Sequence, residues 1–273
     1  MTAMDSRLRP AQVRFYRDQG YLIFDKPVFE PETFTALRQH IEARLDAWTE
    51  ALGKPLDMVD WPHFVDPKLN EWLLADRVLD LVEPLIGPDI ALFACSFITK
   101  LPGASKAAPW HEDATYWGGL AAGIEGCTLW LAVDRSIVDN GCMRVIPGSH
   151  LDRNRAHVPV DDPHRMLLDR QVDPTAFDAS RAVDCILAPN TCSIHDAYVV
   201  HDSRPNRGGQ RRCGFQMRYV PTTVNALNGH QMVLARGRDH AGNDYGNPTQ
   251  VNERRLSNNP QKQLMARISE QLE

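Results

Sequence analysis

Apolar residues at helical spacing define the clearest element in the first third of the chain. Phe34, Leu37, Ile41, Leu45 and Trp48 recur every three or four residues, so they share one face of a helix that begins near residue 31. We expect this face to pack against a sheet. Residues 10–20 predict a shorter helix and residues 21–24 a short buried strand. Residues 1–89 are therefore expected to form a mostly helical support region.

The pattern changes at residue 90, where short apolar runs alternate with turns rich in glycine, proline and asparagine. The runs cover residues 90–101, 109–117, 126–134, 142–147, 183–187, 192–201 and 211–220. Short strands separated in this way are typical of a β-sandwich or a double-sheet jelly roll. We therefore expect residues 90–220 to form a jelly-roll core.

Two segments have a weaker pattern. Residues 151–182 are polar and rich in aspartate, arginine and proline, which predicts a long insertion between strands that lies over a site as a lid. Residues 221–273 predict an irregular tail and a final helix with Leu264, Ile268 and Leu272 on its apolar side. With no internal repeat, residues 1–273 are expected to form a single domain, mainly β with N-terminal helices.

Composition and charge exclude several classes of protein. The formal net charge is -5 over 273 residues, whereas a nucleic-acid-binding domain usually carries a basic face. No apolar run approaches the ~18 residues of a membrane span, and residues 1–10 lack the apolar segment of a secretory signal. We expect neither a nucleic-acid partner nor a membrane partner.

The cysteines also bear on the compartment. All six are scattered and none forms a C-x-x-C pair: Cys95, Cys127, Cys142, Cys185, Cys192 and Cys213. In a chain of this length they are expected to be buried, unpaired side chains in a reducing cytosol. The sequence thus predicts a soluble cytoplasmic protein.

Candidate chemistry begins at His111 and Asp113. If residues 109–117 are one extended strand, side chains alternate between its faces, so His111 and Asp113 point the same way and Glu112 points away. One further ligand would complete a 2-His-1-carboxylate triad, which leaves positions open on a non-haem Fe(II). A surface or capping pair is the alternative, because His-x-Asp alone is a weak signal.

The second candidate segment runs from His201 to Arg212. His201 ends an apolar strand, so its ring can face the interior, and the chain returns through Arg212 after a turn at residues 205–209. If the returning strand pairs with the outgoing one, an inward Arg212 lies near the metal but beyond coordination. A buried guanidinium needs a carboxylate partner. A keto acid with a distal carboxylate, namely 2-oxoglutarate, matches both features.

These segments carry a resemblance to a known family. The chain resembles the phytanoyl-CoA dioxygenase (PhyH) family of Fe(II)/2-oxoglutarate-dependent oxygenases. The similar phrases are residues 16–22, 110–117, 128–134 and 140–150, then His201-x-Ser203-x-x-Asn206 and Arg212. They occur in the family's order from about residue 12 to 220. The resemblance implies a double-stranded β-helix, the cupin-like form of the jelly roll.

The resemblance also implies roles for individual residues. It implies His111, Asp113 and His201 as iron ligands, and Arg212, assisted by Ser203, as the anchor of the distal carboxylate of 2-oxoglutarate. Trp130 falls where the family places an aromatic residue beside this co-substrate. The chain departs from the family's pattern at Glu112, Asp202 and Gly208. These departures leave the triad intact, but the acidic ones could change the charge of its surroundings.

Several nearby side chains have competing interpretations. His195 is a rival third ligand, but an unbroken strand would put it ~20 Å from His201. Arg211 is the rival of Arg212 and is expected to face solvent. Tyr116 and Trp117 either wall a substrate pocket or pack in the core.

The strand that leaves Arg212 offers two further candidates for the substrate pocket. Gln216 and Arg218 share the parity of Arg212, so both are expected to reach the cavity. A second inward guanidinium at Arg218 would favour an acidic substrate.

We expect an Fe(II)- and 2-oxoglutarate-dependent dioxygenase that uses O2 and releases succinate and CO2. Halogenating relatives lack the carboxylate ligand, so Asp113 favours hydroxylation, or a related desaturation or cyclisation. The rivals are a mononuclear zinc hydrolase and a non-catalytic, cupin-like binding protein, and neither needs Arg212. The expected substrate is a small polar molecule or natural product, and the oligomeric state is left open.

Overall fold

The computed structural model describes residues 7–103, 105–121 and 123–272. Its helices are α1 (Pro10–Gln19), α2 (Pro31–Leu52), α3 (Asn70–Leu73), α4 (Asp76–Ile86), α5 (Glu253–Leu256) and α6 (Pro260–Gln271). Its strands are β1 (Tyr21–Phe24), β2 (Met58–Asp60), β3 (Ile90–Lys100), β4 (Ala108–His111), β5 (Cys127–Ala132), β6 (Met143–Val145), β7 (His157–Pro159), β8 (Arg170–Val172), β9 (Val183–Asp184), β10 (Cys192–Asp196), β11 (His201–Ser203), β12 (Arg212–Pro221) and β13 (Val233–Arg236). Short 3-10 helices lie between them: η1 (Pro62–Phe64), η2 (Pro67–Leu69), η3 (Asp113–Tyr116), η4 (Ser149–Leu151), η5 (Pro163–Arg165), η6 (Pro174–Ala176) and η7 (Ala179–Arg181).

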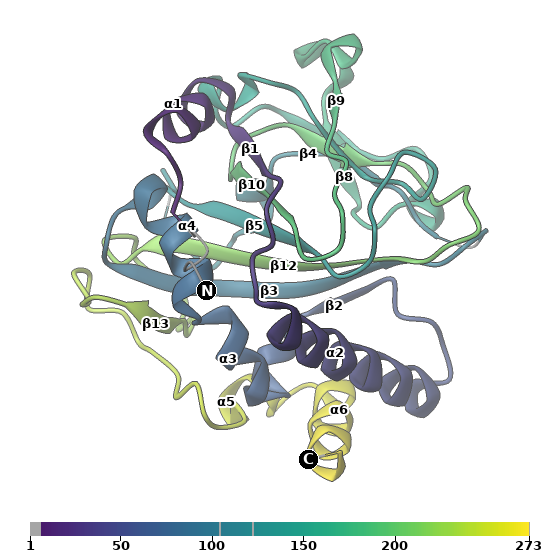
Figure 1. Ribbon diagram of the computed structural model, residues 1–273, viewed down its shortest axis with the longest axis vertical. Coiled ribbons are helices and arrows are strands. Elements are labelled where there is room, and N and C mark those ends of the chain that lie inside the picture. The colour runs from purple at the N-terminus through teal and green to yellow at the C-terminus, as the bar shows by residue number, and fades with distance from the viewer. Residues whose placement is uncertain (1–6, 104, 122, 273) are drawn as a thin grey trace.

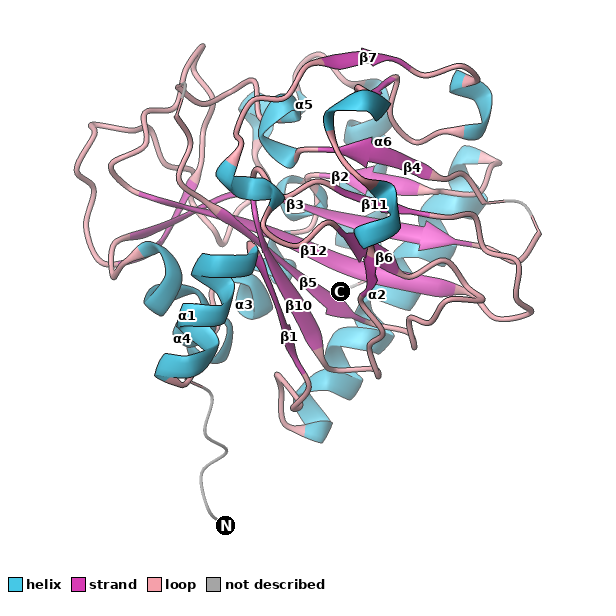
Figure 2. Cartoon of the chain, turned by 90° about the horizontal axis from the view of Figure 1, so that it is seen from above, coloured by secondary structure: helices cyan, strands magenta, loops and turns pink. Residues whose placement is uncertain are grey.

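The strands form two antiparallel sheets. The major sheet has the order β1-β10-β5-β12-β3-β13, with β2 also paired to β3, and the minor sheet has the order β4-β11-β6-β9. Figure 2 shows β4, β11 and β6 side by side in the minor sheet. Consecutive segments of chain cross between the sheets, since β10 belongs to the major sheet and β11 to the minor one. The predicted jelly-roll core, mainly β with N-terminal helices, is confirmed.

The helices cover the outer face of the major sheet. In Figure 1, α2, α3 and α4 lie beside the long strands β3 and β12, and α6 lies below α2, against which it packs. Helix α2 begins with Pro31 at its first turn and ends at Gly53, whose φ of 64° is the left-handed conformation that favours glycine. As predicted, Leu37, Ile41 and Trp48 are fully buried in the core between the helices and the sheet.

Strand β12 shows how the sequence separates core from cavity. Cys213, Phe215, Met217 and Tyr219 point into the core beneath the helices. The residues between them point to the opposite face, because side chains alternate along a strand. Arg212, Gln216 and Arg218 accordingly line a cavity between the sheets.

Several predicted boundaries are wrong. The run at residues 192–201 is two strands in different sheets, and the strand predicted over 183–187 is only two residues long. Helix α6 exists and Ile268 packs against the core as predicted, but its fully buried side chains are Met265, Ala266 and Ser269, and Leu272 is 45% exposed. The backbone carbonyl of Met265 accepts a hydrogen bond from Trp48, so packing against α2 sets the rotation of α6.

The insertion at residues 151–182 carries local structure. β7 and β8 pair as a small two-stranded sheet, and Ala107 bridges to Met166. Leu167 and Leu168 reach the cavity between the sheets. The insertion therefore supplies part of the cavity wall.

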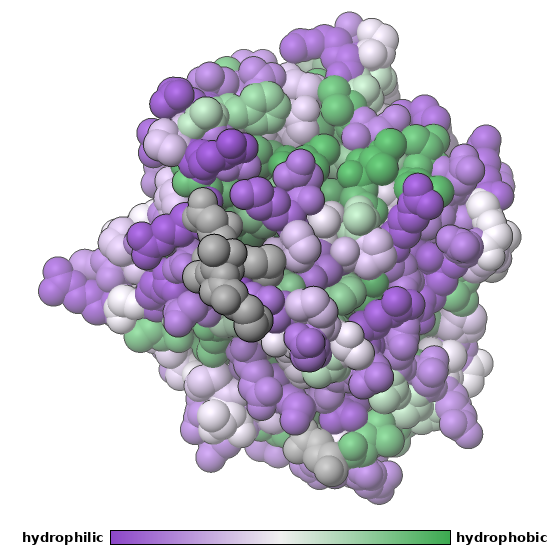
Figure 3. All heavy atoms as spheres, in the orientation of Figure 1, coloured by the Kyte–Doolittle hydropathy of each residue, from purple (hydrophilic) through white to green (hydrophobic). Residues whose placement is uncertain are grey.

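The remaining global features concern the cysteines and the surface. All six cysteines are buried and unpaired, and the expected cytoplasmic location stays a prediction. Across the described residues, no helix is both long enough and apolar enough to cross a membrane. On the face drawn in Figure 3, polar side chains prevail and apolar ones gather mainly in the upper half.

Candidate active site

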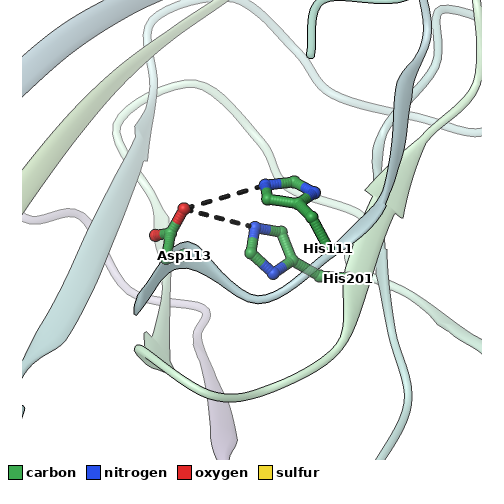
Figure 4. Close-up of side chains that lie close together, drawn as sticks. All are labelled: His111, Asp113 and His201. Atoms are coloured by element: carbon green, nitrogen blue, oxygen red, sulfur yellow. Dashed lines mark ion pairs between the residues drawn. The ribbon is translucent and has the colours of Figure 1, made fainter. Parts of the chain in front are cut away.

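Three side chains with metal-binding atoms meet in a buried position. His111 ends β4, Asp113 begins η3, and His201 begins β11. Because His201 pairs with His111 across the two strands, both rings leave the minor sheet at the same level. Asp113 Oδ1 lies 3.7 Å from His111 Nε2 and 3.8 Å from His201 Nε2 (Figure 4). The three donor atoms lie within 4.8 Å of one another, as the ligands of one ion must.

The protonation of the two rings suits metal binding. Nδ1 of His111 lies 2.7 Å from the carbonyl oxygen of Pro109, and Nδ1 of His201 lies 2.9 Å from that of Val199. A carbonyl can only accept, so Nδ1 carries the proton in each ring and the Nε2 lone pair is left for a metal. Burial also lowers the pKa of His201 well below its usual value, which keeps that ring neutral.

The carboxylate of Asp113 is oriented from the major sheet. Its Oδ2 accepts hydrogen bonds from Thr128 Oγ at 2.7 Å and from His195 Nε2 at 3.3 Å. Oδ1 is thereby left facing His111 and His201. Burial alone would raise the pKa of Asp113, but its contacts with the imidazoles of His111 and His195 hold it well below the usual value. Two imidazoles and one carboxylate with an open side match the donor set of a non-haem Fe(II) site.

The geometry corrects one step of the sequence reasoning. The strand predicted over residues 109–117 ends at His111, and Asp113 belongs to the 3-10 helix η3. Simple alternation therefore does not place Asp113. The turn redirects the chain from the minor sheet toward Thr128 in the major sheet, where the carboxylate is bound.

His195 is much closer to the triad than predicted. Its ring centroid lies 4.6 Å from that of His201, because the chain reverses between β10 and β11 instead of continuing as one strand. Asp196 Oδ1 accepts the backbone N–H of Tyr198 within this reversal. His195 contacts the far oxygen of Asp113, which places it behind the candidate ligand.

Arg212 lies at the other end of the cavity and is 1% exposed. Its Nη1 donates to the carbonyl of Gly141 at 2.6 Å, and its buried Nε has no acceptor among the described residues. No acidic side chain in the described part of the chain forms an ion pair with it. A buried guanidinium with free donors fits the distal carboxylate of the predicted co-substrate.

Lys100, which the sequence analysis did not single out, lies beside Arg212 in the sheet register. Its Nζ contacts two backbone carbonyls, Lys106 O at 2.6 Å and Ser203 O at 3.4 Å. Burial, and then the charge of Arg212, lower the pKa of Lys100 to about 6. This end of the cavity therefore holds two basic groups, and a bound anion would favour the protonated form of Lys100.

Arg211 points out of the cavity, as its parity predicts. It does not face bulk water, however, because it forms ion pairs with Asp134 at 2.7 Å and with Glu42 at 3.2 Å. Glycine at position 214 is required by the neighbouring Trp130, since a Cβ there would lie 1.9 Å from the indole.

A cavity of about 260 Å³ joins the triad to Arg212. The predicted residues that line it are Ser203, Trp130, Tyr116, Trp117, Gln216 and Arg218. Trp117 also packs against Phe93, with ring centroids 5.3 Å apart, and Tyr116 donates to the carbonyl of Arg170. Contact with a substrate stays a prediction for these residues.

Sequence reasoning missed other lining residues. Asp60 and Trp61 come from β2 and the turn after it, a short segment without a motif. Leu167 and Leu168 did carry a signal, because two adjacent leucines stand out in a polar insertion.

The two charged departures from the family's pattern are neutralised locally. Glu112 is fully buried and forms an ion pair with Arg155 of the insertion at 3.0 Å. Asp202 forms a two-point contact with Arg144, one hydrogen bond of which is 2.9 Å long. Neither carboxylate is therefore available as an additional metal ligand.

Comparison with known proteins gives a consistent match. The family model for phytanoyl-CoA dioxygenase (PhyH) matches residues 16–214. Dioxygenase lolE1 of Epichloe uncinata is 26% identical over 219 residues, which cover 73% of this chain and 78% of lolE1. Other curated relatives are matched over only about half of their own length.

Solved structures share the fold. The non-haem monooxygenase ThoJ superposes with a TM-score of 0.71 at 22% identity, over 96% of this chain and 100% of ThoJ. CytC3 with Fe(II) and alpha-ketoglutarate superposes with a TM-score of 0.62 at 22% identity, over 90% of this chain and 96% of CytC3.

Proposed function

Because the chain belongs to the phytanoyl-CoA dioxygenase family, we propose that it hydroxylates an unactivated C–H bond of a small polar or natural-product substrate. The coarser activity follows from the family: the protein is a non-haem, iron- and 2-oxoglutarate-dependent oxygenase. The observation that carries the proposal is the convergence of His111, Asp113 and His201 at one end of a cavity with Arg212 at the other.

The triad would hold the iron through Nε2 of His111 and His201 and one oxygen of Asp113. When bound, iron with 2-oxoglutarate and O2 supplies the oxidising power for attack on a C–H bond, with release of succinate and CO2. The chain supplies the orientation. The carbonyls of Pro109 and Val199 fix the two rings, and Thr128 fixes the carboxylate.

Arg212 would bind the distal carboxylate of 2-oxoglutarate, and Trp130 would form the adjoining wall. The guanidinium carbon lies 5.0 Å from the centroid of the Trp130 ring, which also helps to exclude water from the anchor. Lys100 supplies a second donor that gains a proton when the anion binds. In a water-poor cavity such charge-assisted contacts are strong, so they define the direction of the co-substrate.

Asp113 provides the carboxylate ligand that halogenating relatives lack, so we choose hydroxylation over halogenation. Solved structures of this fold include the carbocyclase SnoK and the epimerase SnoN, so one scaffold supports several reactions. Desaturation and cyclisation are the competing outcomes for this chain.

The test is release of succinate from 2-oxoglutarate during a screen of small metabolites, with mass spectrometry of any product that gains one oxygen. Asp113→Ala should abolish succinate formation. Asp178→Ala is the matched control, because Asp178 is an exposed aspartate in the insertion whose side chain accepts hydrogen bonds from Ser180. Succinate formation that survives in Asp113→Ala would refute the assignment, and a product without added oxygen would refute hydroxylation.

A further inference from the structure

Two opposite charges lie side by side in the cavity wall without forming an ion pair. Ser96 Oγ donates to Asp60 Oδ1 at 2.6 Å and accepts from Arg218 Nη1 at 2.9 Å. Within the described part of the chain, neither Asp60 nor Arg218 takes part in a salt bridge. Asp60 and Arg218 both line the cavity, whereas Ser96 is fully buried behind them.

The sheet register explains this arrangement. Asp60 on β2 pairs with Ser96 on β3, and Ser96 pairs with Gln216 on β12. Arg218 follows two residues after Gln216 on the same face and donates to Gln216 Oε1 at 2.7 Å. Asp60, Ser96 and Arg218 therefore lie on three neighbouring strands of the major sheet, and hydrogen bonds hold them in place.

Arg218 lies apart from Arg212, the proposed anchor of the co-substrate. Arg212 and Arg218 are six residues apart on one strand, which is ~20 Å along the backbone. Arg218 pairs in register with Thr128, the residue that binds the metal-side carboxylate Asp113. Arg218 thus lies next to the triad, on the side away from Arg212, where a primary substrate must approach.

Arg218 retains donor capacity for a ligand. Its two nearest partners, Ser96 and Gln216, are neutral, and its Nε has no acceptor among the described residues. Guanidinium prefers a carboxylate to such neutral partners because the charge-assisted pair is stronger.

The surroundings add positive charge behind Asp60. Lys262 on α6 donates to the backbone carbonyl of Asp60 at 2.9 Å and lies 4.7 Å from the Trp61 ring centroid. Arg255 on α5 has two buried nitrogens, Nε and Nη2, without an acceptor in the described structure. Burial lowers the pKa of Lys262 to about 8 and lowers that of Arg255 from its usual value. The nearby carboxylate of Asp60 does not balance these cations, which favours a substrate that brings negative charge.

The rest of the wall here is apolar and aromatic. Trp61, Phe93 and Trp117 line the cavity together with Met58 and Leu167. A cavity of about 260 Å³ is small for a ligand site and must also receive the co-substrate. The apolar part of the substrate is therefore small.

We propose that the primary substrate is a small carboxylic acid with an amino or hydroxyl group close to its carboxylate. Arg218 binds the carboxylate, Asp60 accepts a hydrogen bond from the amino or hydroxyl group, and the aromatic wall receives an apolar side chain. Asp60 and Arg218 both contact Ser96, so their charges lie close together. This spacing selects a substrate whose amino or hydroxyl group is only one or two bonds from its own carboxylate. This inference rests on the proposed function, since it assigns the substrate of the same site.

The experiment is calorimetric and needs no turnover. Protein loaded with Mn(II) and 2-oxoglutarate is titrated with valine, 2-hydroxy-3-methylbutanoate, 3-methylbutanoate and the methyl esters of all three, and then with the leucine and phenylalanine series. Acids with the amino or hydroxyl group should bind at least 10-fold more tightly than their esters and than the acid that lacks this group. Equal binding of acids and esters, or no binding by any acid, overturns the proposal.

Variants then assign the two roles. Arg218→Met should remove the preference for acid over ester, and Asp60→Asn should remove the preference for the donor-bearing acids. Arg38→Met is the control, because Arg38 is 46% exposed on the outer helix α2. Binding of 2-oxoglutarate, measured first in every variant, separates the two claims. If it binds normally while the substrate preferences persist in the variants, the proposal fails and the oxygenase function stands; if it does not bind to the unaltered protein, the proposed function itself fails.

Discussion

The guanidinium carbon of Arg212 lies 5.0 Å from the centroid of the Trp130 ring, and the edge of that ring covers Gly214. Arg212 and Gly214 are neighbours on the cavity face of β12, and Trp130 lies on the adjacent strand β5. The absence of a side chain at position 214 is therefore what allows the indole to lie beside the anchor. We therefore expect co-substrate binding to depend on both relationships.

Gly214→Ala should weaken 2-oxoglutarate binding by about 10-fold or more. The new Cβ would lie 1.9 Å from the Trp130 ring, so the indole must move away from the anchor. Overpacking of this kind also costs roughly 1–3 kcal/mol of stability. Gly209→Ala is the control, because nothing lies within 4 Å of a Cβ there, and calorimetric titration measures both variants. Unchanged affinity in Gly214→Ala would show that Trp130 does not border the co-substrate.

Arg212→Met should weaken 2-oxoglutarate binding by at least about 100-fold, which is the loss of a charge-assisted two-point contact. Arg211→Met provides a matched control one residue away. Arg211 points out of the cavity and pairs with Asp134, so its loss should lower stability slightly and leave the dissociation constant for 2-oxoglutarate unchanged. Comparable weakening by the two variants would indicate a general effect of charge.

Thr128→Val should lower metal affinity by roughly 10- to 100-fold, because the hydroxyl that orients Asp113 is lost. Competition with a chelator measures the affinity. Ser193→Ala is the control on the neighbouring strand β10, since Ser193 Oγ is buried and has no hydrogen-bond partner in the described structure. Metal affinity that stays unchanged in Thr128→Val would mean that this hydrogen bond does not position the carboxylate.

Lys100 should make the stability of the ligand-free protein depend on pH. Its pKa is about 6 in the folded chain, against about 10.4 when unfolded. Between these values the unfolded chain binds the additional proton, so stability rises with pH across this window by up to about 1.4 kcal/mol per pH unit. Lys100→Met should lower the slope by this contribution relative to the unaltered protein, as measured by urea unfolding from pH 6.5 to 9.5.

Saturating 2-oxoglutarate should weaken the same slope in the unaltered protein, because a bound carboxylate raises the pKa of Lys100 again. Equal slopes in the unaltered protein and in Lys100→Met would contradict the low pKa.

The sequence was sufficient where local pattern decides the structure. The strand that carries Arg212, Gln216 and Arg218 alternates between core and cavity as predicted, and the resemblance placed His111 and His201 in one site. It was insufficient where a chain reversal interrupts an apolar run. Residues 192–201 contain no glycine or proline, so only Asp196, whose side chain binds the next turn, marked the break that brings His195 beside His201.

Long-range packing accounts for the other differences. The rotation of α6 depends on the contact of Trp48 with Met265, more than 200 residues away, and not on the spacing of its own leucines. Asp60 reaches the cavity because a three-residue strand pairs with β3, and three residues carry no detectable periodicity. Predicting either feature requires knowing which element packs or pairs with the segment, and a single sequence does not specify this.

Addition of Fe(II) and 2-oxoglutarate to the purified protein without oxygen tests the central claim, that three donors and Arg212 form one site for both. We predict a weak visible charge-transfer band that needs both additions, is absent from His201→Ala, and requires a higher concentration of 2-oxoglutarate in Arg212→Met. No band in the unaltered protein at saturating concentrations, or an undiminished band in His201→Ala, would contradict the account.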